Sequence, residues 1–126
     1  MTSDKPKGEL SIRVLAMPAD TNPAGDIFGG WLLSQMDVAG NILAKRIASG
    51  RTVTIAIDSM SFLEPVSVGD TLCCYTHVER IGKTSITIMV EAWATPQYTE
   101  ESIKVTEGIF TYVAIDENRK PRVIKT

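Results

Sequence analysis

One stretch of the 126-residue chain has the period of a long helix, and the stretches around it alternate as strands do. In residues 31–48, apolar side chains recur about every three to four positions, which is typical of an amphipathic helix. A period of two is found in residues 9–17, 52–64, 70–81, 84–95 and 102–115. One helix cannot cover a sheet of this size unless the sheet curves around it. The pattern therefore predicts an α+β fold, with a long helix on a curved antiparallel sheet of five strands.

Two features of the strands carry further expectations. In residues 52–64 the apolar alternation slips by one position, which predicts a β-bulge near Asp58–Ser59. Before the slip, the shared apolar face is expected to hold Val53, Ile55 and Ile57.

Several large side chains fall out of phase with the predicted core. They are expected on the other face of the sheet or near its rims, and they are Tyr75, Met89, Trp93, Phe110 and Tyr112. So much apolar surface outside one small core predicts a partner subunit.

The composition excludes several kinds of site and ligand. One His and two Cys are too few for a zinc site built by the chain alone, and His77 is expected at a strand rim rather than in catalysis. A net charge of −2 provides no general field for nucleic acid or an anionic membrane. No run of 18 apolar residues or signal peptide is present. Cys73 and Cys74 would point to opposite faces of a strand, so they are not expected to pair, which favours a reducing cytoplasm.

The length predicts a single domain over residues 1–126. Residues 1–8 are polar, and residues 119–126 hold several cations, so both ends are expected to be loose tails.

The loop before the helix is the candidate for chemistry. Gly29 and Gly30 end a turn-rich segment at the helix N-terminus, where N–H groups are unpaired and the helix carries a partial positive charge. Such a tip suits an oxyanion, and Asp37 lies about 10 Å further along the helix. The residues alone also allow a plain tight turn at Gly29–Gly30 and a solvated polar helix face around Asp37. Asp26 is then either a site residue or a capping residue.

The run of residues 16–37, AMPADTNPAGDIFGGWLLSQMD, resembles the YciA-type acyl-CoA thioesterases of the hotdog fold. More distantly, it resembles the eukaryotic cytosolic acyl-CoA hydrolases. The likeness extends over about residues 9–118 and includes the segments 59–62, 65–70 and 110–116. It implies a homodimer with a continuous sheet, active sites at the subunit interface and assembly into a hexamer as a trimer of dimers. The activity it implies is hydrolysis of acyl-CoA thioesters with broad chain-length tolerance.

Carried over by position, the resemblance assigns roles to five residues. Asp37 matches the catalytic acid, from the other subunit's helix, and the helix-tip amide donors match Gly30 and Gly29. Asp26 matches a second polar position of the site. Asn41, where a small residue is expected in close relatives, is a candidate to hold the attacking water.

The substrate implied by the resemblance needs a phosphate site and an apolar slot. The candidates for the CoA phosphates are Arg80 and Lys83 with the neutral donors Thr84 and Ser85, together with Arg119, Lys120 and Arg122. The candidates for the acyl slot are Trp31, Met36, Met60 and Phe62, which core packing explains equally well. No cofactor is expected, because the CoA moiety belongs to the substrate.

Two other functions stay open at this point. A non-catalytic acyl-CoA-binding or sensor domain is the main alternative, although such a module does not need a carboxylate at Asp37. A hotdog dehydratase is disfavoured because residues 18–50 contain no His. Within hydrolysis, Asp37 acts either as general base on water or through a covalent anhydride.

Overall fold

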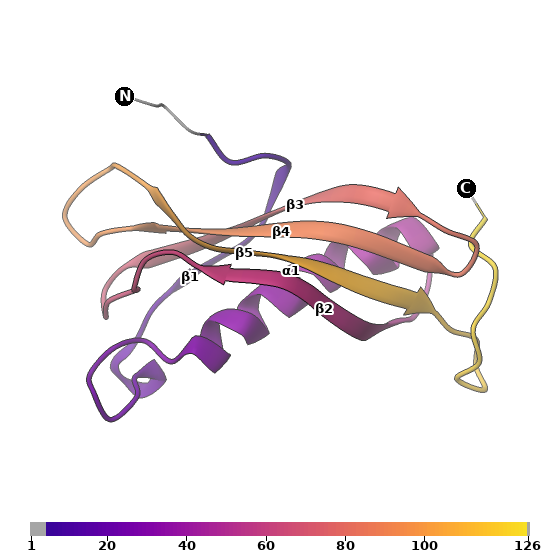
Figure 1. The fold of residues 1–126 in the computed structure, drawn as a ribbon, viewed down its shortest axis with the longest axis horizontal. Helices are drawn as coiled ribbons and strands as arrows, with labels where there is room; N and C mark the ends of the chain where they lie inside the picture. The colour runs from indigo at the N-terminus through magenta and orange to yellow at the C-terminus, as the bar shows by residue number, and fades with distance from the viewer. Residues whose placement is uncertain (1–4, 126) are drawn as a thin grey trace.

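The computed structural model describes residues 5–125. Seven elements follow one another along the chain: β1 (Glu9–Leu15), η1 (Pro18–Asp20), α1 (Gly29–Ala48), β2 (Thr52–Phe62), β3 (Thr71–Ile81), β4 (Ser85–Thr95) and β5 (Ile103–Ala114). The strands form one sheet in the order β1-β3-β4-β5-β2, and every neighbouring pair is antiparallel. Figure 1 shows α1 running along one face of this curved sheet. The predicted fold class and all five strands are therefore confirmed.

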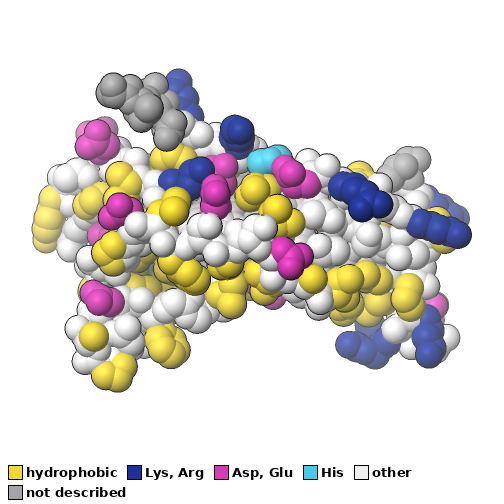
Figure 2. Space-filling view, viewed as in Figure 1, with side chains coloured by type: hydrophobic (Ala, Val, Ile, Leu, Met, Phe, Trp, Pro, Cys, Tyr) yellow, Lys and Arg dark blue, Asp and Glu magenta, His cyan; other side chains and the backbone are white. Residues whose placement is uncertain are grey.

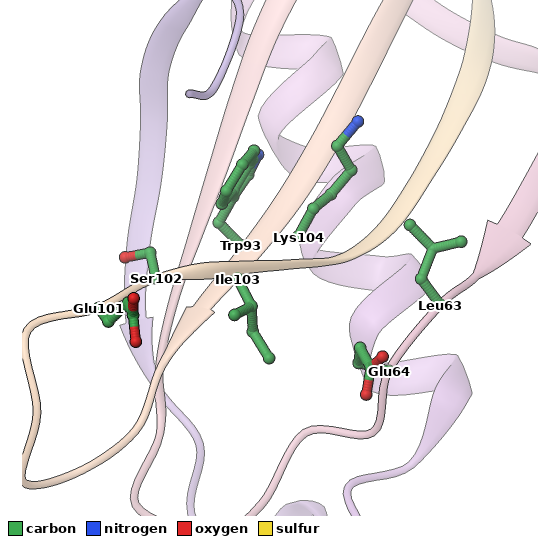
Figure 3. A pocket seen from close by; sticks show the side chains of 7 residues that line it. All are labelled: Leu63, Glu64, Trp93, Glu101, Ser102, Ile103 and Lys104. Carbon is green, nitrogen blue, oxygen red and sulfur yellow. The ribbon is translucent and has the colours of Figure 1, made fainter. Parts of the chain in front are cut away.

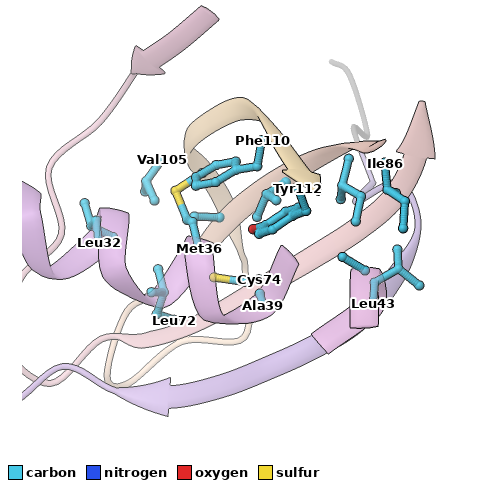
Figure 4. Packing of buried hydrophobic residues seen from close by; sticks show 14 of the residues in the cluster. Leu32, Met36, Ala39, Leu43, Leu72, Cys74, Ile86, Val105, Phe110 and Tyr112 are labelled. Atoms are coloured by element: carbon cyan, nitrogen blue, oxygen red, sulfur yellow. The ribbon is translucent and has the colours of Figure 1, made fainter. Parts of the chain in front are cut away.

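The core lies between α1 and the concave face of the sheet. The apolar stripe of the helix is buried at Leu32, Met36, Ala39 and Leu43, as its period predicts. The central strand β4 contributes Ile86, Ile88 and Val90, none of which has exposed surface. Figure 4 shows Met36 and Leu43 of the helix on the same side of the sheet as Ile86 of β4 and as Phe110 and Tyr112 of β5.

The C-terminal segment is packed onto the end of α1. Arg122 Nη2 donates to the Ala48 carbonyl at 2.7 Å and Nε to the Ile115 carbonyl at 3.2 Å, so it caps the helix C-terminus. Ile124 is buried, and its N–H donates to the Lys83 carbonyl at 2.9 Å. This packed segment differs from the loose tail expected for residues 119–126. The number of cations in the segment could not reveal that one of them is hydrogen-bonded to carbonyl groups at the helix end. Residues 1–4 and 126 of the expected tails lie outside the described residues.

Two register shifts in the pairing of β2 with β5 determine which side chains of β2 face the helix. The bulge predicted near Asp58–Ser59 is confirmed, since the register shifts between Asp58 and Ser61 and Ser59 has a positive φ of 52°. A second shift falls between Thr54 and Ala56. Because Ile55 is the extra residue there, the predicted common face of Val53, Ile55 and Ile57 is wrong.

The bulge at Ile55 turns two threonines toward the helix. Thr52 lies opposite Ala114 and Thr54 opposite Tyr112, and directly opposed residues share a face of the sheet. Ala114 and Tyr112 are fully buried on the helix side. Polar side chains of β2 thus meet α1 where an apolar face was expected.

Phe110 and Tyr112 are core residues, so their predicted place on the outer face or rims is wrong. They stack with ring centroids 6.4 Å apart on the concave side of β5. Gly40 in the middle of α1 makes room for them, because a Cβ there would lie 2.2 Å from the Tyr112 hydroxyl oxygen. The alternation in the sequence did not reveal this, because the pairing with β4 shifts at Val105 and reverses the facing of the residues that follow.

Among the described residues, α1 is the only helix with the length that a membrane span requires, and it is not apolar enough to be one.

The notch at Gly40 predicts a stability effect. Gly40→Ala should lower the free energy of unfolding by about 1–3 kcal/mol, because overpacking must displace the Tyr112 ring or the helix. Gly30→Ala is the matched control in the same helix, where a Cβ meets nothing nearer than 3.8 Å. Chemical denaturation of both variants measures the difference. Equal stability of Gly40→Ala and the parent would contradict the close contact.

Candidate active site

The N-terminal tip of α1 presents two free backbone donors. Phe28 is the N-cap and has no capping side-chain hydrogen bond, while its carbonyl accepts from Trp31 N at 3.0 Å and Leu32 N at 3.2 Å. Among the described residues, no group accepts from the N–H of Gly29 or Gly30. These two donors, at the positive end of a 20-residue helix, can bind an anion or a polarised carbonyl.

Packing within the chain does not require glycine at either position. Neither residue has a positive φ. A Cβ on Gly29 would lie 3.9 Å from the Phe62 ring, and one on Gly30 would lie 3.8 Å from the Phe28 ring, which are ordinary contacts. Glycine in a helix is less stable than alanine by about 1 kcal/mol. The two glycines therefore leave the helix tip sterically open.

The Asp37 carboxylate is held by hydroxyl groups from two strands. Thr54 Oγ1 of β2 donates to Asp37 Oδ1 at 2.7 Å, and Tyr112 Oη of β5 lies 3.0 Å from the same oxygen. Tyr112 Oη also lies 2.9 Å from the Asp37 backbone carbonyl. Burial, with the neighbouring Asp37 carboxylate, raises the pKa of the Tyr112 hydroxyl, so it stays a proton donor.

Asn41 lies one turn after Asp37 and is held in the same way. Its Oδ1 accepts a hydrogen bond from Thr52 Oγ1 of β2. Both polar residues are half-buried along the junction of α1 and β2 rather than on an open helix face. The interpretation of Asp37 and Asn41 as a solvated stripe is thus not what the structure shows.

Asp26 stays apart from this pair. It is exposed in the loop before α1, where Asn22 Oδ1 accepts from the N–H groups of Ala24 and Asp26 at 2.9 and 3.1 Å. Seven residues of helix, about 10 Å of rise, also separate Gly30 from Asp37. One chain thus carries the two parts of the predicted site, the helix tip and the carboxylate, at separate places.

The two predicted cation clusters meet at the opposite end of the molecule. The hydrogen bond from Ile124 N to Lys83 O brings the C-terminal segment beside the β3–β4 hairpin. Figure 2 shows Lys and Arg side chains gathered at this end, where the C-terminus lies in Figure 1. The exposed members of this basic end are Arg51, Arg80, Lys83, Arg119, Lys120 and Lys125. Thr84 and Ser85 are half-buried beside them, and Arg122 is occupied by carbonyl groups.

An apolar cleft of about 260 Å³ opens beside the helix tip. Gly29 and Phe62 line it, so one predicted slot residue lies at the tip. The cleft is completed by Ile27, Leu32, Leu63, Glu64, Pro65 and Val66. Met36 is fully buried in the core, while Trp31 and Met60 pack partly against it. Core packing thus accounts for Met36, Trp31 and Met60. Most of the apolar wall of the cleft is formed by residues that were not candidates for the acyl slot.

A larger pocket of about 650 Å³ lies where β5 begins. Figure 3 shows Trp93 and Lys104 on one side of the strand and Ile103 on the other. Leu63 and Glu64 line both this pocket and the cleft at the helix tip. These two residues therefore lie between the pocket and the cleft.

The remaining reactive side chains lie away from these features. His77 Nε2 pairs with Glu79 at 2.9 Å on β3. Cys73 and Cys74 are free thiols and both are buried, and burial together with the neighbouring Cys73 raises the pKa of the Cys74 thiol to about 12. Within residues 5–125, no group of three or more His, Cys, Asp or Glu side chains is placed to hold a metal ion.

Comparison with known proteins assigns the family. Residues 24–101 match the model of the thioesterase superfamily. The chain belongs to this superfamily. The acyl-CoA thioester hydrolase YciA of Salmonella typhimurium is 55% identical over 120 residues, which cover 93% of this chain and 90% of that protein. The YciA of Escherichia coli is 52% identical over 126 residues, covering 98% and 96%.

Solved thioesterase structures share the fold. A hexameric thioesterase from Yersinia pestis superposes with a TM-score of 0.93 at 53% identity, covering 97% of this chain and 99% of that one. An acyl-CoA hydrolase from Staphylococcus aureus, solved with butyryl-CoA and CoA, gives a TM-score of 0.83 at 28% identity, covering 90% and 69%. The sheet wrapped on one helix is therefore the hotdog fold that the resemblance implied.

Sequence reasoning missed three residues beside the candidate carboxylate. Thr52, Thr54 and Tyr112 supply the hydroxyl groups on Asn41 and Asp37. A partial signal was present, because the two threonines alternate with Val53 and so share one face of the strand. The face that meets the helix could be chosen only once the bulge at Ile55 was known.

Proposed function

We propose that this protein is an acyl-CoA thioesterase that hydrolyses acyl-CoA to a free acid and CoA. The observation that carries the proposal is the pair of unpaired helix-tip amides and a hydroxyl-held carboxylate on one helix. The YciA enzymes of similar sequence support the substrate class. The non-catalytic binding module is disfavoured because binding alone gives no reason to fix Asp37 with two hydroxyl groups.

We infer that two copies pair along β2 to build each site. This strand ends the sheet, so its outer edge has no partner among the described strands. The Ile55 side chain of this strand is 58% exposed, and Val38 of α1 is 53% exposed. A long apolar edge of this kind is a pairing surface. A twofold axis there would bring the helix tip of one copy toward Asp37 of the other.

The proposed reaction uses both halves of the site. The thioester oxygen accepts from Gly30 N–H, with Gly29 beside it, and Asp37 takes a proton from the attacking water. The tetrahedral intermediate then expels the CoA thiolate, which needs no strong acid because a thiol has a pKa of about 8.5. Asp37 then passes the proton that it took from water to the CoA thiolate, so the products are a carboxylic acid and CoA and Asp37 is again a carboxylate. Asn41 is placed to hold the water, and Asp26 comes from the loop beside the tip.

Other parts of the proposal concern assembly and surroundings. Several solved relatives are hexamers, which supports a hexamer built as a trimer of such dimers. The proposed chemistry calls for no cofactor, since the CoA moiety is part of the substrate. A cytoplasmic location is proposed from the two free cysteines.

Asp37→Asn should abolish most of the hydrolysis while leaving the fold intact. The amide keeps the shape of the side chain but cannot accept a proton, so kcat should fall by at least about 100-fold. Thiol release from a panel of acyl-CoAs measures it, with Glu100→Gln in the exposed loop between β4 and β5 as the matched control. Near-normal turnover of Asp37→Asn would refute the assignment, and no thiol release by the parent would favour the binding module.

A single turnover in ¹⁸O-water separates the general-base route from the covalent anhydride route. Label found in the Asp37 side chain identifies the anhydride.

Mixed oligomers test whether each site is shared by two copies. Gly30→Pro removes the N–H donor in the first helical turn, where proline is tolerated, and should be inactive alone. Co-refolding it with Asp37→Asn should restore about a quarter of the parent activity, because each mixed dimer then contains one intact site. If both elements came from one chain, every site in the mixture would carry a defect. No recovery despite mixed dimers confirmed by mass spectrometry would overturn the shared site.

The basic end predicts salt-dependent substrate binding. CoA carries several phosphate charges. Arg80→Ala and Lys83→Ala should therefore each raise KM for acyl-CoA severalfold at low salt, a loss of about 1 kcal/mol in binding free energy, while kcat stays unchanged. Lys5→Ala, at the far N-terminal segment, is the control. KM and kcat of the parent and of each variant are measured at low and at high salt. A KM that responds neither to salt nor to these variants would exclude this end as the phosphate site.

A further inference from the structure

The hydrogen bonds on Asp37 make its two carboxylate oxygens unequal. Thr54 Oγ1 at 2.7 Å and Tyr112 Oη at 3.0 Å both approach Oδ1. Among the described residues, no donor reaches Oδ2. A carboxylate that is hydrogen-bonded through one oxygen keeps the other free to accept a proton or to attack a carbonyl.

The Tyr112 donor is fixed more rigidly than a surface hydroxyl would be. Its ring has no exposed surface, stacks on Phe110, and fits over Gly40, where even a methyl group would collide with the hydroxyl oxygen. The same hydroxyl also reaches the backbone carbonyl of Asp37 at 2.9 Å. Tyr112 thus fixes the helix turn and the carboxylate with one polar atom.

The second donor approaches from the neighbouring strand. Thr54 lies directly opposite Tyr112 in the β2–β5 pairing, so the two hydroxyls reach the helix side by side. The bulge that follows at Ile55 lets β2 present this polar residue inward while apolar residues come later in the strand. The arrangement therefore depends on three elements, α1, β2 and β5, meeting at one oxygen.

We propose that Tyr112 and Thr54 are positioning residues that fix Asp37 through Oδ1, so that Oδ2 is the oxygen that reacts. This inference rests on the proposed thioesterase function. A side chain held on one side has fewer orientations to lose when the attacking water and the thioester arrive. Removing either hydroxyl would let the carboxylate rotate and would lower the share of reactive arrangements, without removing any contact to substrate.

The variants Tyr112→Phe and Thr54→Val test the proposal in the full, assembled protein. Each deletes one hydroxyl with little change in shape, and kcat should fall about 10- to 100-fold while KM changes little. Thr54→Ser keeps the donor and should restore near-parent kcat. The matched controls are Tyr75→Phe and Thr87→Val, which delete the same groups from β3 and β4 away from Asp37.

A double-mutant cycle separates positioning from a merely structural role. In the Asp37→Asn background, neither hydroxyl deletion should lower the residual rate further, because the group they position is already lost. Thermal unfolding of each variant is recorded alongside, and Thr54→Val covers the case in which the buried Tyr112→Phe folds poorly.

The outcomes for the two proposals are distinct. If Asp37→Asn is inactive but both hydroxyl variants keep parent kcat, the positioning role is wrong and the thioesterase assignment stands. A hydroxyl deletion that costs as much in the Asp37→Asn background as in the parent also overturns the positioning role. If Asp37→Asn itself stays active, the proposed function fails first.

Discussion

The contact between Tyr112 and Gly40 joins the sheet to the helix at the centre of the molecule. The aromatic side chain of β5 reaches α1 only because the helix has no Cβ at that position. The sheet buries one stripe of α1, while Ser34, Val38 and Lys45 on the other side stay exposed. Polar residues beside the apolar stripe then lie at the junction with an edge strand, and Asp37 and Asn41 are in that situation.

The length of α1 also separates the parts of the candidate site along one chain. The free amides are at its first turn, Asp37 is two turns later, and the basic end lies beyond its last turn. The proposed substrate, with a thioester and distant phosphates, would use all three regions. The proposed antiparallel pairing of two copies along β2 would reverse the order of these regions in the partner, so that each substrate would meet complementary parts of both chains. A near-neutral chain can then bind a polyanion through one basic end rather than through its net charge.

The sequence predicts the positions of the helix and strands better than it predicts which face of each strand is buried. Periodicity located α1 and all five strands, because the helical and strand periods differ clearly, and it also located the bulge at Ser59. It assigned Phe110 and Tyr112 to the wrong side of β5, because the pairing with β4 shifts at Val105 and reverses the facing of the residues that follow. The same limit applies to Arg122, whose partners are carbonyl groups of Ala48 and Ile115 rather than a residue near it in a motif. For the candidate site, Asp37 and the glycines came from the motif, whereas Thr52, Thr54 and Tyr112 needed the three-dimensional pairing.

The glycines of α1 show how structural and functional demands can be told apart on one helix. Gly40 is explained within the chain, since any side chain there would strike Tyr112. Gly29 and Gly30 have ordinary backbone angles and open space, so the stability that glycine forfeits in a helix is not recovered by any contact in this chain. The proposed function accounts for them, because a substrate or a second copy would approach the helix tip there. Because the amides there also lack partners, the tip meets the steric and the electrostatic condition for stabilising an oxyanion at the same place.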